Sequence, residues 1–451
     1  MSVNDRIATQ VKRYAKITPS NASSTGVFSY SQGNPIIRLT IAEADAMLMA
    51  PECRLQFRLK GFSDFANPKT PIRAGGTTNL DSKIGAQSVI QTLTISSRRY
   101  ATSITEQILN YNQLVSVAHP ALESARDTFV QRSHEEMCIG KGIIDRDELN
   151  QTQENSAANN TNVIDLQRRL IATAGTQAQD IGWDCSIQLY SGMFMSDQGL
   201  DLRLLGGLEI EITLASDVNV FDNATSTTNY EMSDVVLNCP LLYKSAAQMA
   251  QGVSPSSFSF LSYTSLYNVV QSTNATITNK VGLRGALAMI QKFVPTKYIN
   301  NFAVNAKAFA GWNPGIKRLV FHRNGQRFPL EYGIKTDRGD GNPSAEVHGE
   351  KTPQILLNSL SAFENYKDVK HSHFTNQNLH DQSDGVYYLG ISFDQVSGQG
   401  IDLSGGTVST ELESTLQDPV DNTAITFGVY TFFLNKTTLV ISPNNRIQSI
   451  E

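Results

Sequence analysis

Three histidines and two aspartates lie close together in the last quarter of the chain. They are His371, His373, His380, Asp381 and Asp384. Imidazole and carboxylate groups bind divalent transition metals, so residues of these types at this spacing could hold a metal ion. The surrounding residues are rich in Asn, Gln and Ser, which favours an exposed loop over a pocket. We therefore expect a polar surface loop here and predict no metal site.

Other patterns that carry chemistry in enzymes are incomplete in this chain. Glu209 and Glu211 resemble a carboxylate pair, but residues two apart on a strand share one solvated face. Gly140 and Gly142 flank a lysine without the spacing or the Ser or Thr of a phosphate-binding loop. No Gly-x-Ser-x-Gly motif occurs. We predict no catalytic, cofactor-binding or metal-binding residues, and hence a protein that is not an enzyme.

Two segments could contact a partner without catalysis. Arg338 and Asp340 flank a glycine in the tripeptide that some integrin-binding loops use, but a string of three residues can also arise by chance in a chain of this length. Residues 1–34 carry four basic side chains against one acid, followed by Ser, Asn and Gly. We expect an N-terminal arm that is either a solvated terminus or a basic segment touching a neighbouring subunit, a membrane surface or packaged nucleic acid. So few charges allow only weak, salt-sensitive contact.

The composition favours a large protein with little net charge. At 451 residues the chain exceeds what one hydrophobic core usually supports, which predicts two domains of roughly 200 residues. Charged residues make up 18%, below the roughly 25% of typical soluble domains. The net charge of −5 argues against binding through a basic face, so we predict no specific nucleic-acid partner.

Features of membrane-spanning and secreted proteins are missing from the sequence. No run approaches the roughly 18 consecutive apolar residues of a membrane span, and we expect no signal peptide at the N-terminus. The four cysteines are far apart and lack partners at zinc-binding spacing, so we expect free, mostly buried thiols. They are Cys53, Cys138, Cys185 and Cys239. Synthesis in a reducing compartment, the cytosol or the nucleus, follows from this expectation.

The strongest structural signal is the strict alternation of apolar and polar residues in the run 207–214. Such alternation predicts a strand with one buried and one solvated face. Similar runs predict first-half strands at 36–41, 53–59, 88–95, 184–190, 208–214 and 234–243. They predict second-half strands at 257–267, 287–294, 316–334, 386–393, 408–416, 425–433 and 439–441. The 316–334 segment is expected to form a hairpin across Asn324 and Gly325, a strong turn pair.

Helical signals interrupt the strands in a few places. Ser103 and Glu106 form a capping box that predicts a helix over the residues that follow. Its apolar stripe consists of Ile104, Ile108, Tyr111 and Val115. Further helices are expected after Pro120 and from Thr352. The polar segment 147–162 is expected to be a long loop.

These elements predict a mainly β protein with two consecutive antiparallel jelly rolls and short helices between the strands. Long excursions suit a jelly roll, whereas a small up-and-down barrel has short, even turns. We divide the chain into an arm at 1–34, a first roll at 35–243 and a second roll at 244–451. The expected core members are Leu208, Ile210, Ile212, Leu214, Ile425, Phe427 and Val429.

Three places in the sequence carry a resemblance to a known family. At 192–214 a short polar step leads into the alternating strand, and a further strand at 234–243 closes the first half. The third place runs from 387–394 through the glycines near 405 to the strands at 423–441. Together they resemble the double jelly-roll major capsid proteins of tailless icosahedral DNA viruses, which include polinton-like viruses, virophages, giant viruses and tectivirus-type phages.

The resemblance implies a major capsid protein that works by self-assembly. It implies a homotrimer whose six rolls form a pseudo-hexameric capsomer, with loops outside the shell and the N-terminal arm inside. It further implies a location in the virion, contacts with neighbouring trimers and with minor capsid or penton proteins, and contact of the arm with an inner membrane or genome. A low charge density agrees, because it lowers the cost of burying large contacts.

Two other functions remain open at this point. One is a minor capsid or spike protein with related rolls. The other is a carbohydrate-binding or carbohydrate-cleaving β-sandwich, which would need exposed aromatic platforms and, for cleavage, a carboxylate pair in a groove. The presence of only two tryptophans, Trp183 and Trp312, argues against the second.

Overall fold

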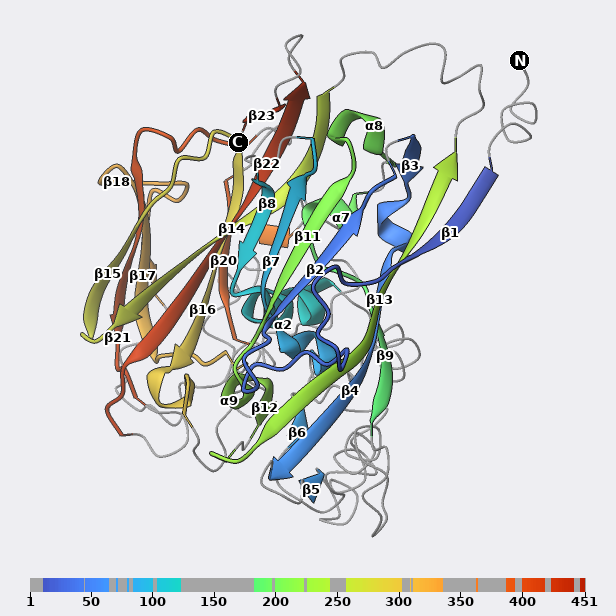
Figure 1. The fold of residues 1–451 in the computed structure, drawn as a ribbon. Coiled ribbons are helices and arrows are strands. Elements are labelled where there is room, and N and C mark those ends of the chain that lie inside the picture. The colour runs from blue at the N-terminus through green and yellow to red at the C-terminus, as the bar shows by residue number, and fades with distance from the viewer. Residues whose placement is uncertain are drawn as a thin grey trace, which may run out of the picture.

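The protein consists mainly of antiparallel strands in two groups, which Figure 1 shows side by side. The computed structural model describes residues 11–43, 45–64, 70–71, 79–80, 84–99, 104–122, 182–196, 199–222, 225–243, 257–301, 309, 311–335, 362–363, 387–393, 400–417, 423–441 and 447–450. Every ladder between the described strands is antiparallel. Among the described strands, no sheet contains members of both halves of the chain. The fold is therefore a double jelly roll.

The larger sheet of the first roll is organised around its last strand. Its members are β1 (Val11–Ile17), β3 (Ala46–Leu48), β4 (Arg54–Asp64), β5 (Thr70–Pro71), β9 (Trp183–Ile187), β10 (Leu200–Asp201) and β13 (Asn229–Tyr243). β13 pairs with β4 and also with β1, from Val11 opposite Tyr243 to Ile17 opposite Leu237. The described part of the expected arm thus includes a strand that pairs within the first roll.

The second sheet of the first roll has the order β2-β11-β7-β8. Its members are β2 (Ile36–Ile41), β7 (Ile90–Ser97), β8 (Ile104–Leu109) and β11 (Leu208–Leu214), and a small separate ladder joins β6 (Asn79–Leu80) to β12 (Phe221–Asp222). Every second residue of β11 is buried, from Leu208 to Leu214. The strand predicted from alternation is confirmed, because its apolar face turns into the core.

The helix predicted from Ser103 is wrong in its first half. Residues 104–109 form β8, which pairs with β7, and helix α2 (Tyr111–Leu122) begins only after Asn110. Glu106 does not cap its own segment, because its carboxylate accepts hydrogen bonds from Gly192 and Met193. Asn110 has φ of 53°, a left-handed conformation that asparagine tolerates, and turns the chain from strand into helix. Pro120 lies within α2, and residues beyond 122 up to 181 lie outside the described part.

The second roll again has two sheets, one of which centres on a long strand near the C-terminus. The first sheet contains β14 (Ser257–Val270), β16 (Ala286–Pro295), β20 (Leu389–Ser392), β22 (Phe427–Ile441) and β23 (Ile447–Ile450). The second contains β15 (Asn274–Lys280), β17 (Ile316–Arg323), β18 (Gln326–Arg327), β19 (Ile334–Lys335) and β21 (Thr407–Ser414). The strands predicted separately at 425–433 and 439–441 are one strand, β22, flanked by β14 and β16.

The predicted hairpin across Asn324 and Gly325 is confirmed. Both residues have positive φ, 51° and 79°, and they connect β17 to β18. Two consecutive positive φ values are typical of the turn that matches the twist of a two-residue hairpin.

Short helices connect the strands in both rolls. They are α7 (Gly192–Met195), α8 (Leu202–Leu205) and α9 (Asp217–Val220), with the 3₁₀ helices η1 (Ala50–Glu52), η2 (Gly85–Val89) and η4 (Thr296–Tyr298). The helix predicted from Thr352 and the polar segment 147–162 lie outside the described residues, apart from Ala362 and Phe363, which are buried.

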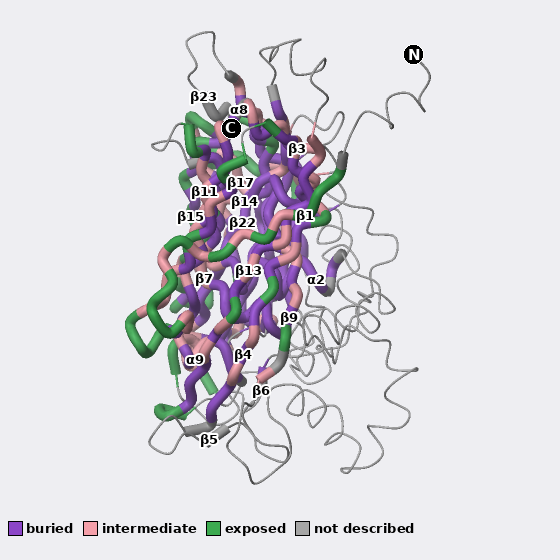
Figure 2. Tube along the Cα trace, turned by 45° about the vertical axis from the view of Figure 1, so that its right-hand side comes forward, coloured by how far each residue is buried: buried purple, intermediate pink, exposed green. Residues whose placement is uncertain are grey.

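One continuous hydrophobic core extends through both rolls, and Figure 2 shows the buried residues running along the strands. Among the predicted core members, Phe427 and Val429 are buried like the four apolar residues of β11, while Ile425 packs against the core from its edge. Three cysteines are described, and each is a buried free thiol, as predicted. Because each fully buried aliphatic or aromatic side chain contributes about 1.5–3 kcal/mol, this core is the main source of stability.

Candidate functional site: the seam between the two rolls

The two rolls meet where α2, α7 and β8 of the first roll lie against β14 and β16 of the second (Figure 1). We call this contact region the seam. Hydrogen bonds, backbone contacts and aromatic rings cross it, so the rolls form one unit. The contacts at the seam fix the orientation of the first roll relative to the second.

The backbones of the two rolls touch at Gly192. A Cβ atom at this position would lie 1.4 Å from the carbonyl oxygen of Leu261 on β14. Gly192 is the first residue of α7, and the hydroxyl of the preceding Ser191 accepts a bond of 3.1 Å from the Phe194 N–H. The Ser-Gly pair therefore starts the helix and allows it to lie directly on the second roll.

Glu106 of β8 is a buried carboxyl beside this contact. Its two oxygens accept hydrogen bonds from the backbone N–H groups of Gly192, at 2.8 Å, and Met193, at 3.1 Å. Burial raises the pKa of Glu106 to about 7, while the two backbone bonds oppose the increase. The carboxyl therefore changes its charge near neutral pH, directly beside the closest approach of the rolls.

Lys292 of β16 joins the second roll to α2. Its side chain is 1% exposed, and its Nζ atom donates to Gln113 Oε1 at 2.8 Å, Ser116 Oγ at 2.5 Å and the carbonyl oxygen of Phe309 at 2.6 Å. An ammonium has three N–H donors, and these three acceptors use all of them. Burial of the ammonium without such acceptors would cost several kcal/mol, so the arrangement fixes α2 against β16.

Aromatic rings also pack across the seam. Tyr190, which follows β9, lies with its ring centroid 6.1 Å from that of Tyr263 on β14. His119 of α2 meets Tyr190 edge-on at 5.8 Å. Such pairs add about 0.5–1.5 kcal/mol beyond the area they bury.

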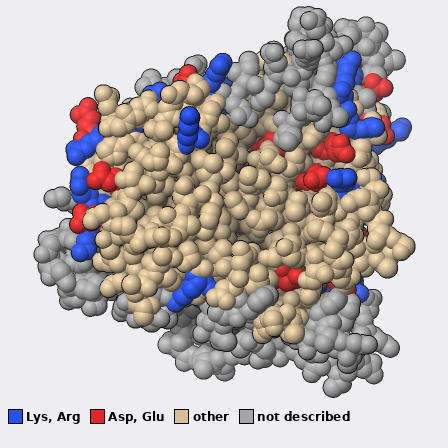
Figure 3. Space-filling view, turned by 60° about the vertical axis from the view of Figure 1, so that its left-hand side comes forward, with Lys and Arg blue, Asp and Glu red and all other residues tan. Residues whose placement is uncertain are grey.

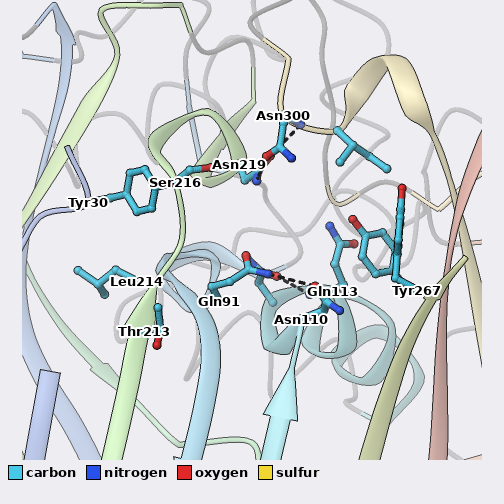
Figure 4. Close-up of a pocket in the computed structure, with 13 residues that line it drawn as sticks. Tyr30, Gln91, Asn110, Gln113, Thr213, Leu214, Ser216, Asn219, Tyr267 and Asn300 are labelled. Carbon is cyan, nitrogen blue, oxygen red and sulfur yellow. Dashed lines mark hydrogen bonds between the residues drawn. The ribbon is translucent and has the colours of Figure 1, made fainter. Parts of the chain in front are cut away.

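A pocket of about 500 Å³ lies at the seam, where side chains of both rolls face a common space (Figure 4). Six of its described lining residues are amides: Gln91, Asn110, Asn112, Gln113, Asn219 and Asn300. Tyr30, Tyr267 and Tyr430 line it as well, and none of the described lining residues is charged. Its volume is within the range of small-molecule sites.

The amides of the pocket hold one another in place. Gln91 Nε2 donates to Asn110 Oδ1 at 3.1 Å, and Asn110 Nδ2 donates across the seam to Ser265 Oγ at 3.1 Å. On the other side, Asn219 Nδ2 donates to Asn300 Oδ1 at 2.6 Å, and the Asn300 N–H donates to Asn219 Oδ1 at 3.2 Å. The pocket is thus preformed by bonds between the rolls.

The residues singled out in the sequence lie away from the seam or outside the described part. Glu211 pairs with Arg38 Nε across neighbouring strands at 2.9 Å, and Glu209 is on the same half-exposed face of β11. This confirms a solvated face. The histidine group at 371–384, the lysine between Gly140 and Gly142, and Arg338 to Asp340 lie outside the described residues. Among those described, no group of three or more His, Cys, Asp or Glu residues could hold a metal ion.

Sequence reasoning missed Glu106, Lys292 and the pocket. One signal was available for Lys292, because it interrupts the apolar run of 286–295, where a charge must find buried partners.

The surface charges are unevenly distributed on the face shown in Figure 3. Charged side chains lie mainly toward its margins and its centre is uncharged, which suits a surface that contacts other molecules. No helix in the described ranges is long and apolar enough to span a membrane.

Comparison with known proteins identifies the fold by structure and not by sequence. No family model and no curated protein matches the chain. Solved structures do match along nearly its whole length. One is a chain of the Sputnik virophage determined by cryo-electron microscopy, with a TM-score of 0.59 and 14% identity, covering 97% of this chain and 88% of that chain.

Two further solved structures are major capsid proteins. That of Faustovirus matches with a TM-score of 0.56 and 7% identity, covering 96% of this chain and 91% of that chain. That of mavirus matches with a TM-score of 0.50 and 9% identity, covering 97% of this chain and 89% of that chain. The double jelly roll is the fold that the chain shares with them.

Proposed function

We propose that the protein is the major capsid protein of an icosahedral DNA virus, and that it acts by self-assembly and not by catalysis. The observation that carries this proposal is the length of the structural match. The similarity to the Faustovirus and mavirus proteins covers 96–97% of this chain and 89–91% of theirs. A carbohydrate-active protein with one β-sandwich would share only one of the two rolls.

The seam supports this function physically. The two rolls of each chain need a fixed angle between them in a capsomer. A small rotation of one roll in every subunit would otherwise accumulate into misalignment around the shell. The contacts of Gly192 with Leu261 and of Lys292 with Gln113 restrain that angle, and Glu106 holds Gly192 in place within the first roll. We propose a homotrimer whose six rolls form a pseudo-hexameric capsomer, with residues 35–243 and 244–451 as the two rolls and β1 of the arm added to the first.

The surface supports contacts between copies. Leu109 of β8 and Val269 of β14 are apolar side chains that are 43% and 44% exposed at the seam. Such side chains, with the uncharged centre of the face shown in Figure 3, suit interfaces whose centres exclude charge. Neighbouring trimers, and minor capsid or penton proteins, are the proposed partners in the virion, after synthesis in the host cytosol or nucleus.

The basic arm has a weaker role in this proposal. Lys12 forms an ion pair with Glu52 at 2.5 Å, and Arg13 lies over the Tyr243 ring at 5.4 Å, so two of its charges already have partners inside the first roll. We propose that any contact of the arm with an inner membrane or the genome is weak and sensitive to salt.

Native mass spectrometry and negative-stain microscopy of the purified chain test the proposal. A mass three times that of the chain and hexagon-like plates are expected. Only monomers at micromolar concentration, for a chain that is folded by circular dichroism, would contradict it. Copy number in purified particles separates the rival minor capsid or spike protein, since a major capsid protein exceeds every other structural protein in number.

A further inference from the structure

The pocket at the seam has an exposed rim, a buried floor and open space between them, and contacts that only hold two rolls together require none of these. It has an exposed rim, since Tyr30 and Tyr267 are 47% and 46% exposed, and a buried floor that includes Asn112 and Gln113. Figure 4 shows Tyr30 and Tyr267 on opposite sides of the space, with amide side chains between them. An interface that only joins two rolls would be filled by side chains instead of leaving about 500 Å³ open.

Tyr267 forms an aromatic platform at one side of the pocket. It is directly opposite Tyr430 in the ladder of β14 and β22, with ring centroids 5.0 Å apart. Gly428, two residues before Tyr430, leaves room for the ring, because a Cβ there would lie 2.7 Å from the Tyr267 hydroxyl oxygen. Burial raises the pKa of Tyr267 above its ordinary value, which is already well above physiological pH, so the hydroxyl is neutral there.

The amides offer hydrogen bonds in both directions. A primary amide has two N–H donors and an oxygen with two lone pairs. In the bonds described above, Asn219 uses one donor and accepts one bond, and Asn110 does the same. Each therefore keeps a second donor and a second lone pair, which is the pattern that hydroxyl groups require because a hydroxyl both donates and accepts.

The lining also excludes other ligand classes. None of its described residues is charged, so a phosphate, a carboxylate or an ammonium group would find no counter-charge there. A purely apolar ligand would leave six amides without the water that solvates them. A neutral ring with hydroxyl groups at its edge and C–H groups on its face satisfies both the amides and the tyrosine.

We propose that this pocket binds a neutral saccharide unit, stacked on Tyr267 and hydrogen-bonded by the amides of both rolls. The site belongs to the single chain and does not depend on the function proposed above. It also differs from the carbohydrate-active β-sandwich considered from the sequence, because its aromatic residues are tyrosines and its described lining contains no carboxylate pair.

Saturation-transfer NMR with the purified full-length protein, in its native oligomeric state, tests the site. The probes are lactose, maltose, chitobiose and mannobiose, with sialyllactose as a charged comparison and uridine and adenosine as aromatic ones. We expect saturable binding of at least one neutral disaccharide, with a Kd on the order of 1 mM. Sialyllactose should bind no more tightly than lactose, which is its uncharged portion.

Variants separate the site from other surfaces. Tyr267→Ala should weaken binding about tenfold, whereas Tyr267→Phe should keep most of it because the ring remains. Tyr332→Ala is the matched control, since Tyr332 is a similarly exposed tyrosine, at 51%, that does not line the pocket. Tyr30→Ala, in the loop before β2, replaces Tyr267→Ala if that variant fails to fold, and should also weaken binding.

Three results would overturn the proposal. The first is no saturable binding of any of the four neutral disaccharides. The second is binding that neither Tyr267→Ala nor Tyr30→Ala weakens. The third is uridine or adenosine binding at the tyrosine in preference to every saccharide.

Discussion

Lys292 of the second roll donates a hydrogen bond of 2.8 Å to Gln113 of the first, although both side chains are buried. The two residues are 179 positions apart in the sequence. Two of the three acceptors of this buried ammonium, Gln113 and Ser116, are on the other roll, so the stability of each roll depends on the presence of its neighbour.

Lys292→Met should therefore destabilise the whole chain. Methionine fills a similar volume but cannot donate, so Gln113, Ser116 and the Phe309 carbonyl all lose this donor. We expect a loss of at least about 2 kcal/mol in the free energy of unfolding, measured by chemical denaturation. Lys280→Met, at an exposed position on β15, is the control. Equal midpoints for both variants would argue against a role of Lys292 in joining the rolls.

Gly192→Ala should prevent the rolls from docking. The added Cβ would lie 1.4 Å from the Leu261 oxygen, so α7 or β14 must move. We expect loss of the native oligomer in size-exclusion chromatography and a lower melting temperature. Gly282→Ala should behave as the unmodified chain, since a Cβ there meets nothing within 4 Å. A native elution profile for Gly192→Ala would refute the close approach.

Stability should depend on pH through Glu106. Its pKa rises from 4.5 to about 7 on folding, so the folded chain holds this proton more tightly than the unfolded chain. The resulting stabilisation is complete below about pH 4.5, declines as the unfolded carboxyl ionises, and is lost by about pH 7.

The variant Glu106→Gln has no ionisable group at this position, so it is the reference for the pH dependence of stability. Between pH 4.5 and pH 8, the unmodified chain should lose about 3 kcal/mol of unfolding free energy relative to the variant. Urea denaturation at several pH values measures the difference. Parallel curves for the two proteins would show that Glu106 does not titrate in this range.

The buried thiols should resist alkylation. Contact with Cys239 and burial both raise the pKa of Cys53, and the thiolate is the reactive form. We expect iodoacetamide to label Cys53, Cys185 and Cys239 only after unfolding, as followed by peptide mass spectrometry. Labelling of Cys53 in the folded protein at the rate of a free cysteine would contradict its burial.

The error at β8 shows where a single sequence is ambiguous. Ile104 and Ile108 are four residues apart, a spacing that puts them on one side of a helix and also on one side of a strand. Only the ladder with β7 decides between the two, and that ladder is a tertiary contact. The alternation in β11 has no such ambiguity, which explains why its bounds were predicted without error.

The break predicted within β22 has a different cause. Polar residues at 435–438 resemble a turn, yet Asn435 and Thr437 are fully buried. Asn435 Nδ2 donates to Ser262 Oγ and to Thr437 Oγ1, each at 2.9 Å. Neighbouring side chains thus accept both N–H groups of this buried amide, and the sequence does not reveal which neighbours a polar residue will have.

The pocket could not be predicted for the same reason. Its lining comes from the loop before β2, from β7, α2, β11 and α9, and from three segments of the second roll. Each amide alone reads as an ordinary surface residue. These amides converge only because the two rolls dock in one arrangement. Gly192 and Lys292 hold that arrangement, and neither residue belongs to a recognisable sequence motif.

In both rolls the strand at the centre of one sheet is also the last long strand of that roll to be synthesised. β13 lies between β1 and β4, and β22 lies between β14 and β16. A nascent polypeptide therefore carries unpaired edges until the ribosome has passed each of these 15-residue strands. A prematurely terminated chain that lacks β22 has no central strand between β14 and β16. Its second roll therefore cannot form as it does in the full-length chain.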